Sequence, residues 1–61
     1  MTFRELDRLA RQNGCIEIKQ VGSHHHYIHP EKNGKLTIPE HGSKDVPPKV
    51  ANNILKWLGL K

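Results

Sequence analysis

The spacing of apolar side chains changes twice along this chain, and that change constrains the fold more than any other feature of the sequence. The first apolar residues recur at the spacing of one face of an α-helix: Phe3, Leu6, Leu9 and Ala10. Thr2 and Glu5 fit a capping box, in which each side chain bonds the other residue's backbone amide. Gly14 suits the turn after a helix, so we predict a helix over residues 3–13.

After Cys15 the apolar period falls to two, which is typical of β-strands. Ile16 and Ile18 alternate with polar residues and predict a half-buried first strand. Two further strands are predicted from the sequences HHHYIH and KLTI, which are separated by an Asn-Gly pair that favours a hairpin. In the last strand Leu36 and Ile38 share one face.

Pro47 and Pro48 suit the start of a second helix, because the first helical residue needs no amide donor. An apolar stripe at helical spacing follows: Val50, Ala51, Ile54, Leu55, Trp57 and Leu58. Gly59 ends it. Consecutive strands with short connections form an antiparallel sheet, and two amphipathic helices both need an apolar surface to cover. We therefore expect an α+β fold of order α-β-β-β-α, with both helices on one face of a three-stranded sheet.

The chain has 61 residues, which we expect to form a single domain over residues 1–61. A chain of this size buries only about 60% of the surface of its unfolded state, so it cannot enclose a deep pocket for a small molecule. Any substrate is therefore expected to be a large, extended molecule bound in a shallow groove. Ten Lys and Arg against six Asp and Glu give a net charge of +4, which attracts polyanions such as nucleic acid.

Cys15 is the single cysteine, which excludes an intrachain disulfide. The first 14 residues are charged throughout and have no apolar core of a secretory signal, and no apolar run reaches membrane-spanning length. We expect a cytoplasmic protein with no membrane association.

The stretch GSHHHYIHP, residues 22–30, places four histidines in nine residues and allows three interpretations. A zinc site formed by His24, His26 and His41 matches no known ligand spacing and has no cysteine nearby, so no metal or other cofactor is expected. Solvent-exposed strand histidines without a function are the second interpretation. Proton transfer is the third, because imidazole titrates near neutral pH.

Proton transfer to or from RNA suits a small basic chain, because the 2′-hydroxyl of RNA is an internal nucleophile and no cofactor is needed. Gly22 and Ser23 precede His24 and offer an accessible backbone and a hydroxyl group to a phosphate. Four lysines are candidates for further phosphate contacts: Lys19, Lys35, Lys44 and Lys49. Phe3 and Trp57, at helical spacing, are expected in the core.

The orientation of the second strand follows from which of two neighbouring residues faces the helices. If Ile28 does, His24 and His26 are buried with it, whereas if Tyr27 does, all three lie on the open face. A bulge between His24 and Ile28 would reconcile the two patterns. We favour Tyr27 in the core and His24 in solvent; the alternative is that Tyr27 stacks on a base or bonds a phosphate.

The sequences GSHHHYIHP, LTIPEHGSKDVPP and ILKWLGL together resemble the HicA toxins of bacterial and archaeal toxin–antitoxin pairs over nearly the whole chain. The resemblance implies a fold like that of double-stranded-RNA-binding domains. It also implies a metal-independent endoribonuclease that cleaves mRNA, arrests growth and is neutralised by a HicB antitoxin. The family's catalytic histidine follows Gly-Ser, which corresponds here to His24.

The resemblance also implies supporting roles and leaves some open. Gly22 and Ser23 match the residues leading into the catalytic histidine, and His41 matches the histidine of the family's Pro-x-His-Gly segment. The acid that protonates the leaving oxygen could be His24 itself, water, His26 or His41. Position 15 often carries a large aromatic residue in the family and is Cys15 here. The alternative function is a non-catalytic RNA-binding module of the same fold.

Overall fold

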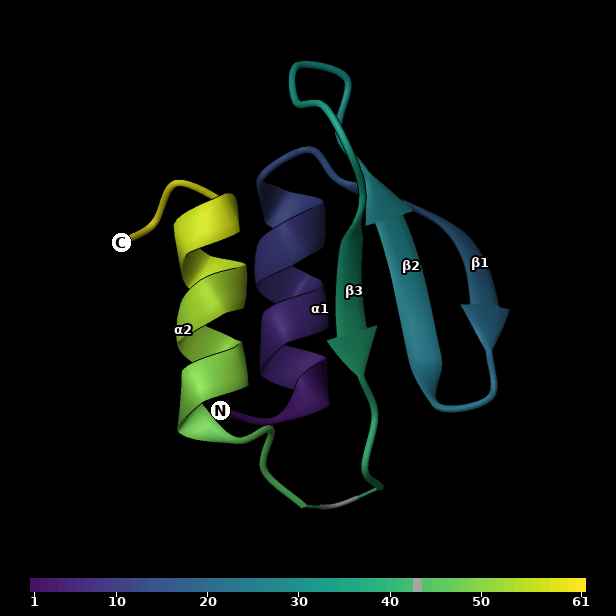
Figure 1. The fold of residues 1–61 in the computed structure, drawn as a ribbon, viewed down its shortest axis with the longest axis vertical. Helices are drawn as coiled ribbons and strands as arrows, with labels where there is room; N and C mark the ends of the chain where they lie inside the picture. The colour runs from purple at the N-terminus through teal and green to yellow at the C-terminus, as the bar shows by residue number, and fades with distance from the viewer. Residues whose placement is uncertain (43) are drawn as a thin grey trace.

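The computed structural model describes residues 1–42 and 44–61, and its elements follow the predicted order (Figure 1). They are α1 (Phe3–Gln12), β1 (Ile16–Val21), β2 (His24–Ile28), β3 (Leu36–Pro39) and α2 (Pro48–Trp57). The three strands form one antiparallel sheet in the order β1-β2-β3. The α+β fold of order α-β-β-β-α is therefore confirmed. No described helix is long and apolar enough to cross a membrane.

The predicted ends of α1 are present. The Thr2 hydroxyl accepts a hydrogen bond from the Glu5 amide at 3.2 Å, and the Glu5 carboxylate accepts one from the Thr2 amide at 2.9 Å. Gly14 follows the helix with a φ of +92°, a conformation that side chains disfavour. A Cβ at Gly14 would also make a tight contact of 3.1 Å with Nε2 of His29, so both the backbone conformation and the space favour glycine there.

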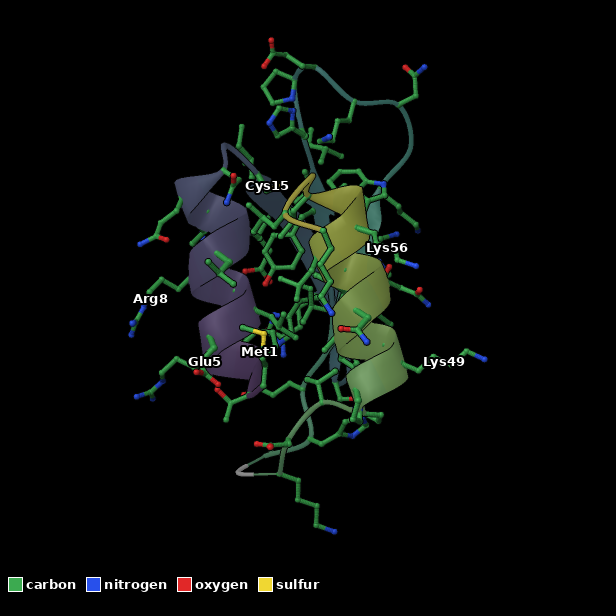
Figure 2. All side chains as sticks on the ribbon, turned by 90° about the vertical axis from the view of Figure 1, so that its left-hand side faces the viewer. Met1, Glu5, Arg8, Cys15, Lys49 and Lys56 are labelled. Carbon is green, nitrogen blue, oxygen red and sulfur yellow. The ribbon has the colours of Figure 1, made fainter. Side chains whose placement is uncertain are left out.

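Both helices cover the same face of the sheet, as expected, and pack chiefly against β3 (Figure 1). The core beneath them combines helix and sheet residues: Leu6, Ala10, Cys15, Tyr27, Leu36, Ile38, Val46, Ala51, Ile54 and Leu58. Phe3 and Trp57 are partly buried against this core. Charged side chains such as Arg8 and Lys49 point away from the helices into solvent (Figure 2).

Strand β2 alternates regularly, with Tyr27 facing the helices. Tyr27 is fully buried and His25 is 7% exposed, whereas His24 and Ile28 lie on the open face of the sheet. The Tyr27 hydroxyl donates to Oδ1 of Asp7 at 2.6 Å, which joins β2 to α1. The prediction that Tyr27 is core and His24 is accessible is confirmed, and the stacking alternative for Tyr27 is wrong.

The prediction of a half-buried β1 with its isoleucines inward is wrong. Ile16 is 55% and Ile18 is 49% exposed, and the single bulge of the sheet falls in β1, between Glu17 and Lys19, rather than in β2. Ile16 pairs with the outward Ile28 and Glu17 with the inward Tyr27, so the isoleucine side of β1 faces away from the helices. Here Glu17 takes the inward position because it has charged partners there.

The hydrogen bond between Tyr27 and Asp7 predicts a stability change that isolates the hydroxyl group. We expect Tyr27→Phe to lower the free energy of unfolding by about 1–2 kcal/mol, because a buried hydroxyl that donates to a carboxylate is lost while the ring remains. Urea unfolding followed by the fluorescence of Trp57 measures the change. In an Asp7→Asn background, Tyr27→Phe should lower the free energy of unfolding by a smaller amount. An unchanged unfolding midpoint for Tyr27→Phe alone would contradict the hydrogen bond between Tyr27 and Asp7.

Candidate functional site

The connection between β1 and β2 is a tight turn at residues 22–23, immediately before His24. Gly22 has a φ of +58°, which the turn requires and which glycine adopts without strain. The Gln20 side-chain amide donates to the Gly22 carbonyl at 3.0 Å, and the Glu40 backbone amide donates to the Ser23 carbonyl at 2.7 Å. The turn is thus tied to both neighbouring strand ends, while Gly22 and Ser23 themselves are exposed.

His24 is the first residue of β2 and is exposed on the open face of the sheet. Its backbone pairs with Val21 on one side and Pro39 on the other, so both neighbouring strands fix its position. None of the described side-chain hydrogen bonds involves the His24 ring. An exposed imidazole on a fixed backbone is available to take up or release a proton of a bound ligand.

His26 lies on the same face as His24, two residues along β2, and its ring has a partner. Its Nδ1 lies 2.9 Å from the Thr37 hydroxyl on β3. Loss of solvation at this half-buried position, followed by the positive charges of Lys35 and Lys19, lowers the pKa of His26 below its usual value. The neutral form of His26 is therefore favoured, with Nε2 free of described hydrogen bonds.

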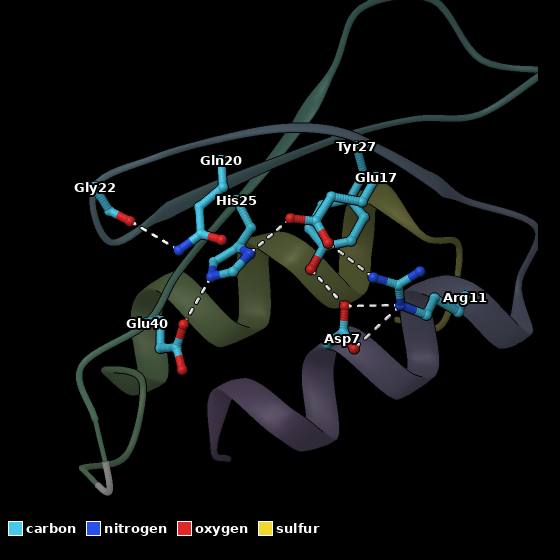
Figure 3. A network of polar contacts seen from close by, with 8 residues as sticks. All are labelled: Asp7, Arg11, Glu17, Gln20, Gly22, His25, Tyr27 and Glu40. Carbon is cyan, nitrogen blue, oxygen red and sulfur yellow. Dashed lines mark hydrogen bonds and ion pairs between the residues drawn. The ribbon is translucent and has the colours of Figure 1, made fainter.

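His25 points to the opposite face and lies between two carboxylates (Figure 3). Its Nδ1 is 2.7 Å from Oε2 of Glu17, and its Nε2 is 2.7 Å from Oε1 of Glu40. The ring of Phe3 packs on it with 4.3 Å between ring centroids. Burial lowers the pKa of His25, but the hydrogen bonds to Glu17 and Glu40 outweigh it, so the net effect raises the pKa above its usual value.

His29 has a structural role at the far end of the sheet. Its Nε2 donates to the Asn13 carbonyl at 2.8 Å, and its Nδ1 accepts the Glu31 amide at 3.0 Å, so both ring nitrogens have partners. His29 thereby joins the loop after β2 to the end of α1.

His41 and Lys44 are exposed in the segment between β3 and α2. His41 follows Pro39, the β3 residue that pairs with His24, at a separation of two residues. The Lys44 amide donates to the His41 carbonyl at 3.2 Å. Among the described residues, no hydrogen bond joins the side chain of His41 or of Lys44 to His24. His41 therefore lies two residues after the strand partner of His24 but is not bonded to its ring.

The open face of the sheet also carries apolar and basic side chains around the histidines. Four apolar residues on it are at least two-fifths exposed: Ile16, Ile18, Val21 and Ile28. Lys19 pairs with His26 across β1 and β2, and Lys35 adds charge near the same ring. This surface, with His24 at one end, can contact a polyanion through its cations or a protein through its apolar side chains.

A hollow of about 520 Å³ lies on the other side of the sheet, where the start of α1 meets the segment after β3. Its described lining residues are Thr2, Phe3, Arg4, Asp7, Glu40 and Gly42. His24 does not line it. Within residues 1–42 and 44–61 no group of three His, Cys, Asp or Glu side chains is placed to hold a metal ion, so His24, His26 and His41 do not form one.

The buried arrangement around His25 was not predicted from the sequence. The alternation that places Tyr27 inward also places His25 inward, and this signal was available in the sequence. The two carboxylates that bond His25 could not be found in this way, because Glu17 is 8 and Glu40 is 15 residues away in the sequence. Gly22 and Ser23 form the exposed turn that leads into His24, the first residue of β2.

Comparison with known proteins supports the resemblance found in the motifs. Residues 3–60, nearly the whole chain, match the family model described as the HicA toxin of bacterial toxin–antitoxin systems. A search of curated proteins finds no match. Since the match spans the complete α-β-β-β-α arrangement, the chain belongs to the HicA toxin family of bacterial toxin–antitoxin systems.

Proposed function

We propose that the chain acts in the cytoplasm as an endoribonuclease that cleaves mRNA and inhibits growth, with residues 1–61 forming a single toxin domain and His24 as the catalytic residue. The observation that supports this most is the difference between the three consecutive histidines of β2. His25 is held between carboxylates and His26 bonds Thr37, whereas the exposed His24 ring has no described hydrogen bond. Only His24 combines solvent exposure, a fixed backbone and the position after Gly22 and Ser23.

The proposed reaction uses the RNA's own 2′-hydroxyl. His24 accepts the proton of this hydroxyl as its oxygen attacks the adjacent phosphorus, and the bond from phosphorus to the 5′-oxygen breaks. The departing 5′-oxygen takes a proton from protonated His24, from water, or from His26 or His41. The products are a 2′,3′-cyclic phosphate and a 5′-hydroxyl, and the scheme requires no metal ion.

The surroundings of His24 supply groups that can hold a phosphate. Gly22 and Ser23 are exposed in the turn immediately before His24, and the Ser23 hydroxyl is a donor that a phosphate can use. Lys44 is exposed in the segment that follows Glu40, whose amide bonds Ser23. With a net charge of +4, the chain favours binding to the RNA backbone.

The family implies an antitoxin partner, and we propose that a HicB antitoxin binds the open face of the sheet. The exposed apolar residues of β1 and Ile28 make this face more suitable for a protein than for RNA, which buries little aliphatic surface. Val21 pairs directly with His24, so a protein seated on β1 also covers the catalytic ring. The rim of the antitoxin's binding surface should be acidic, so that it complements Lys19 and Lys35.

Replacement of the catalytic imidazole is the direct test of the enzymatic proposal. We expect His24→Ala to reduce RNA cleavage at least about 100-fold, because the group that transfers the proton is lost. RNA affinity and the thermal unfolding midpoint should change little, because the ring makes no described hydrogen bond. Cleavage of a labelled transcript by purified protein, with binding measured in parallel, provides the comparison.

Two controls separate this mechanism from other possibilities. Cleavage by the wild type should persist in a chelator of divalent cations and should stop on a substrate with a 2′-deoxyribose at the cleavage site. His26→Ala serves as the matched histidine variant on the same face, and its loss of activity should be smaller than that of His24→Ala. A wild type that binds RNA and never cleaves it, with or without metal, would identify a non-catalytic RNA-binding module instead.

The antitoxin surface is tested by charges placed on β1. We expect the double variant Ile16→Asp and Ile18→Asp to weaken toxin–antitoxin binding at least about tenfold. Binding of the antitoxin to this variant would bury two unpaired carboxylates in an apolar contact. Calorimetric titration measures the Kd. Leu60→Asp is the control, because Leu60 is 45% exposed at the other end of the chain and should have no effect. Equal affinities of the double variant and the wild type would exclude this face.

A further inference from the structure

His25 occupies a position in β2 that an apolar residue would ordinarily fill, and it lies there between two carboxylates. It is 7% exposed, and each ring nitrogen lies 2.7 Å from a carboxylate oxygen. Ionised carboxylates only accept hydrogen bonds, so both ring nitrogens must donate. The ring is therefore an imidazolium with two ionic hydrogen bonds, one to Glu17 on β1 and one to Glu40 after β3.

Figure 3 shows both carboxylates at the His25 ring, and one of them, Glu40, also connects this ring to the backbone before His24. Glu40 accepts from His25 with its side chain and donates its own amide to the Ser23 carbonyl at 2.7 Å. One residue thus bonds both sequence neighbours of His24. The other carboxylate, Glu17, also accepts from Arg11 of α1 at 2.8 Å, so the arrangement is anchored to the helix layer.

We propose that the imidazolium of His25, with Glu17 and Glu40, forms a clamp that positions His24 for proton transfer to and from RNA. The three are positioning residues and do not touch the substrate themselves. The inference rests on the proposed function of His24. It explains why a histidine, and not a larger apolar side chain, lies in the core directly beside the proposed catalytic residue.

The clamp requires a proton on each of the two ring nitrogens of His25. If His25 becomes neutral, one ring nitrogen presents a lone pair to a carboxylate at 2.7 Å, and this contact becomes repulsive. Because the carboxylates raise the pKa of His25, the charged form is stabilised in the folded state. Its contribution to stability is fully present below the pKa of an unfolded histidine and is lost as the pH rises through the folded value.

Other charged groups surround the clamp and set the conditions for its titration. On α1 they are Asp7 and Arg11, which bond each other, and Arg11 also bonds Glu17. On the other face of β2 they are His24 and His26. Only the two carboxylates contact the His25 ring by hydrogen bonds among the described residues. Removal of one carboxylate charge should therefore lower the pH at which the clamp opens.

The test is the pH dependence of kcat for Glu40→Gln. The amide oxygen of glutamine can still accept from Nε2 of His25, and the backbone amide can still bond Ser23, so the fold is retained. We expect kcat of the wild type to fall at alkaline pH and this fall to move to lower pH by about one unit in Glu40→Gln, because one opposite charge is lost. KM should change less than kcat. Glu31→Gln, at an exposed glutamate in the loop after β2, is the matched control and should leave the profile unchanged.

A uniform loss of kcat at every pH in Glu40→Gln would overturn the proposal, because a purely structural contact has no reason to shift the profile. An unchanged profile would overturn it as well.

A second measurement does not depend on activity. In nitrogen NMR spectra of the histidine rings at neutral pH, His25 should be protonated on both nitrogens in the wild type. The ring signals of His24 should shift in Glu40→Gln and not in Glu31→Gln. If the wild type cleaves no RNA, the proposed function fails, while these spectra still decide whether the clamp exists: a neutral His25, or His24 signals that Glu40→Gln leaves unchanged, would contradict it.

Discussion

Because Tyr27 is fully buried and its hydroxyl bonds Asp7 on α1, the orientation of β2 is fixed along its whole length. A strand presents alternate residues to opposite faces, so the burial of Tyr27 places His25 inward and His24 and His26 outward. A shift of one residue in β2 would bury His24 and expose the ionic arrangement around His25. The chemistry of the open face therefore depends on the packing of one tyrosine beneath it.

The polar side chains under the sheet form a continuous series from helix to strand end. Asp7 bonds both Tyr27 and Arg11, Arg11 bonds Glu17, and Glu17 bonds His25 (Figure 3). Charges removed from water are costly unless each has a partner, and none of the described buried side-chain nitrogen or oxygen atoms lacks one. In a chain with so small an apolar core, this series orients α1 against the sheet with directional contacts that apolar packing alone does not provide.

The parts of the fold that sequence predicted are those set by local rules. Thr2 and Glu5 mark the start of α1 because a capping box is complete within four residues, and Leu36 and Ile38 alternate as their burial requires. The inward isoleucines of β1 were wrong because alternation does not say which face is covered. That depends on how β1 pairs with β2, where Glu17 lies opposite the inward Tyr27 and Ile16 opposite the outward Ile28.

The candidate site was only partly predictable for the same reason. The Gly-Ser-His sequence and the family resemblance identified His24, whose neighbours in the site are its neighbours in the chain. The environment of His25 is formed by residues from β1 and from the segment after β3, which only the folded sheet brings together. No local pattern in the sequence distinguishes Glu40, which bonds His25, from exposed glutamates such as Glu31.

The central claim is that adjacent histidines of β2 have opposite environments, with His24 available for chemistry and His25 held as a cation inside. Diethyl pyrocarbonate, which acylates accessible uncharged imidazole, tests this directly when modification of each histidine is followed over time by tandem mass spectrometry. We expect rapid modification of His24, with His25 the slowest of the five histidines of the chain. Equal rates at His24 and His25, or protection of His24, would contradict it.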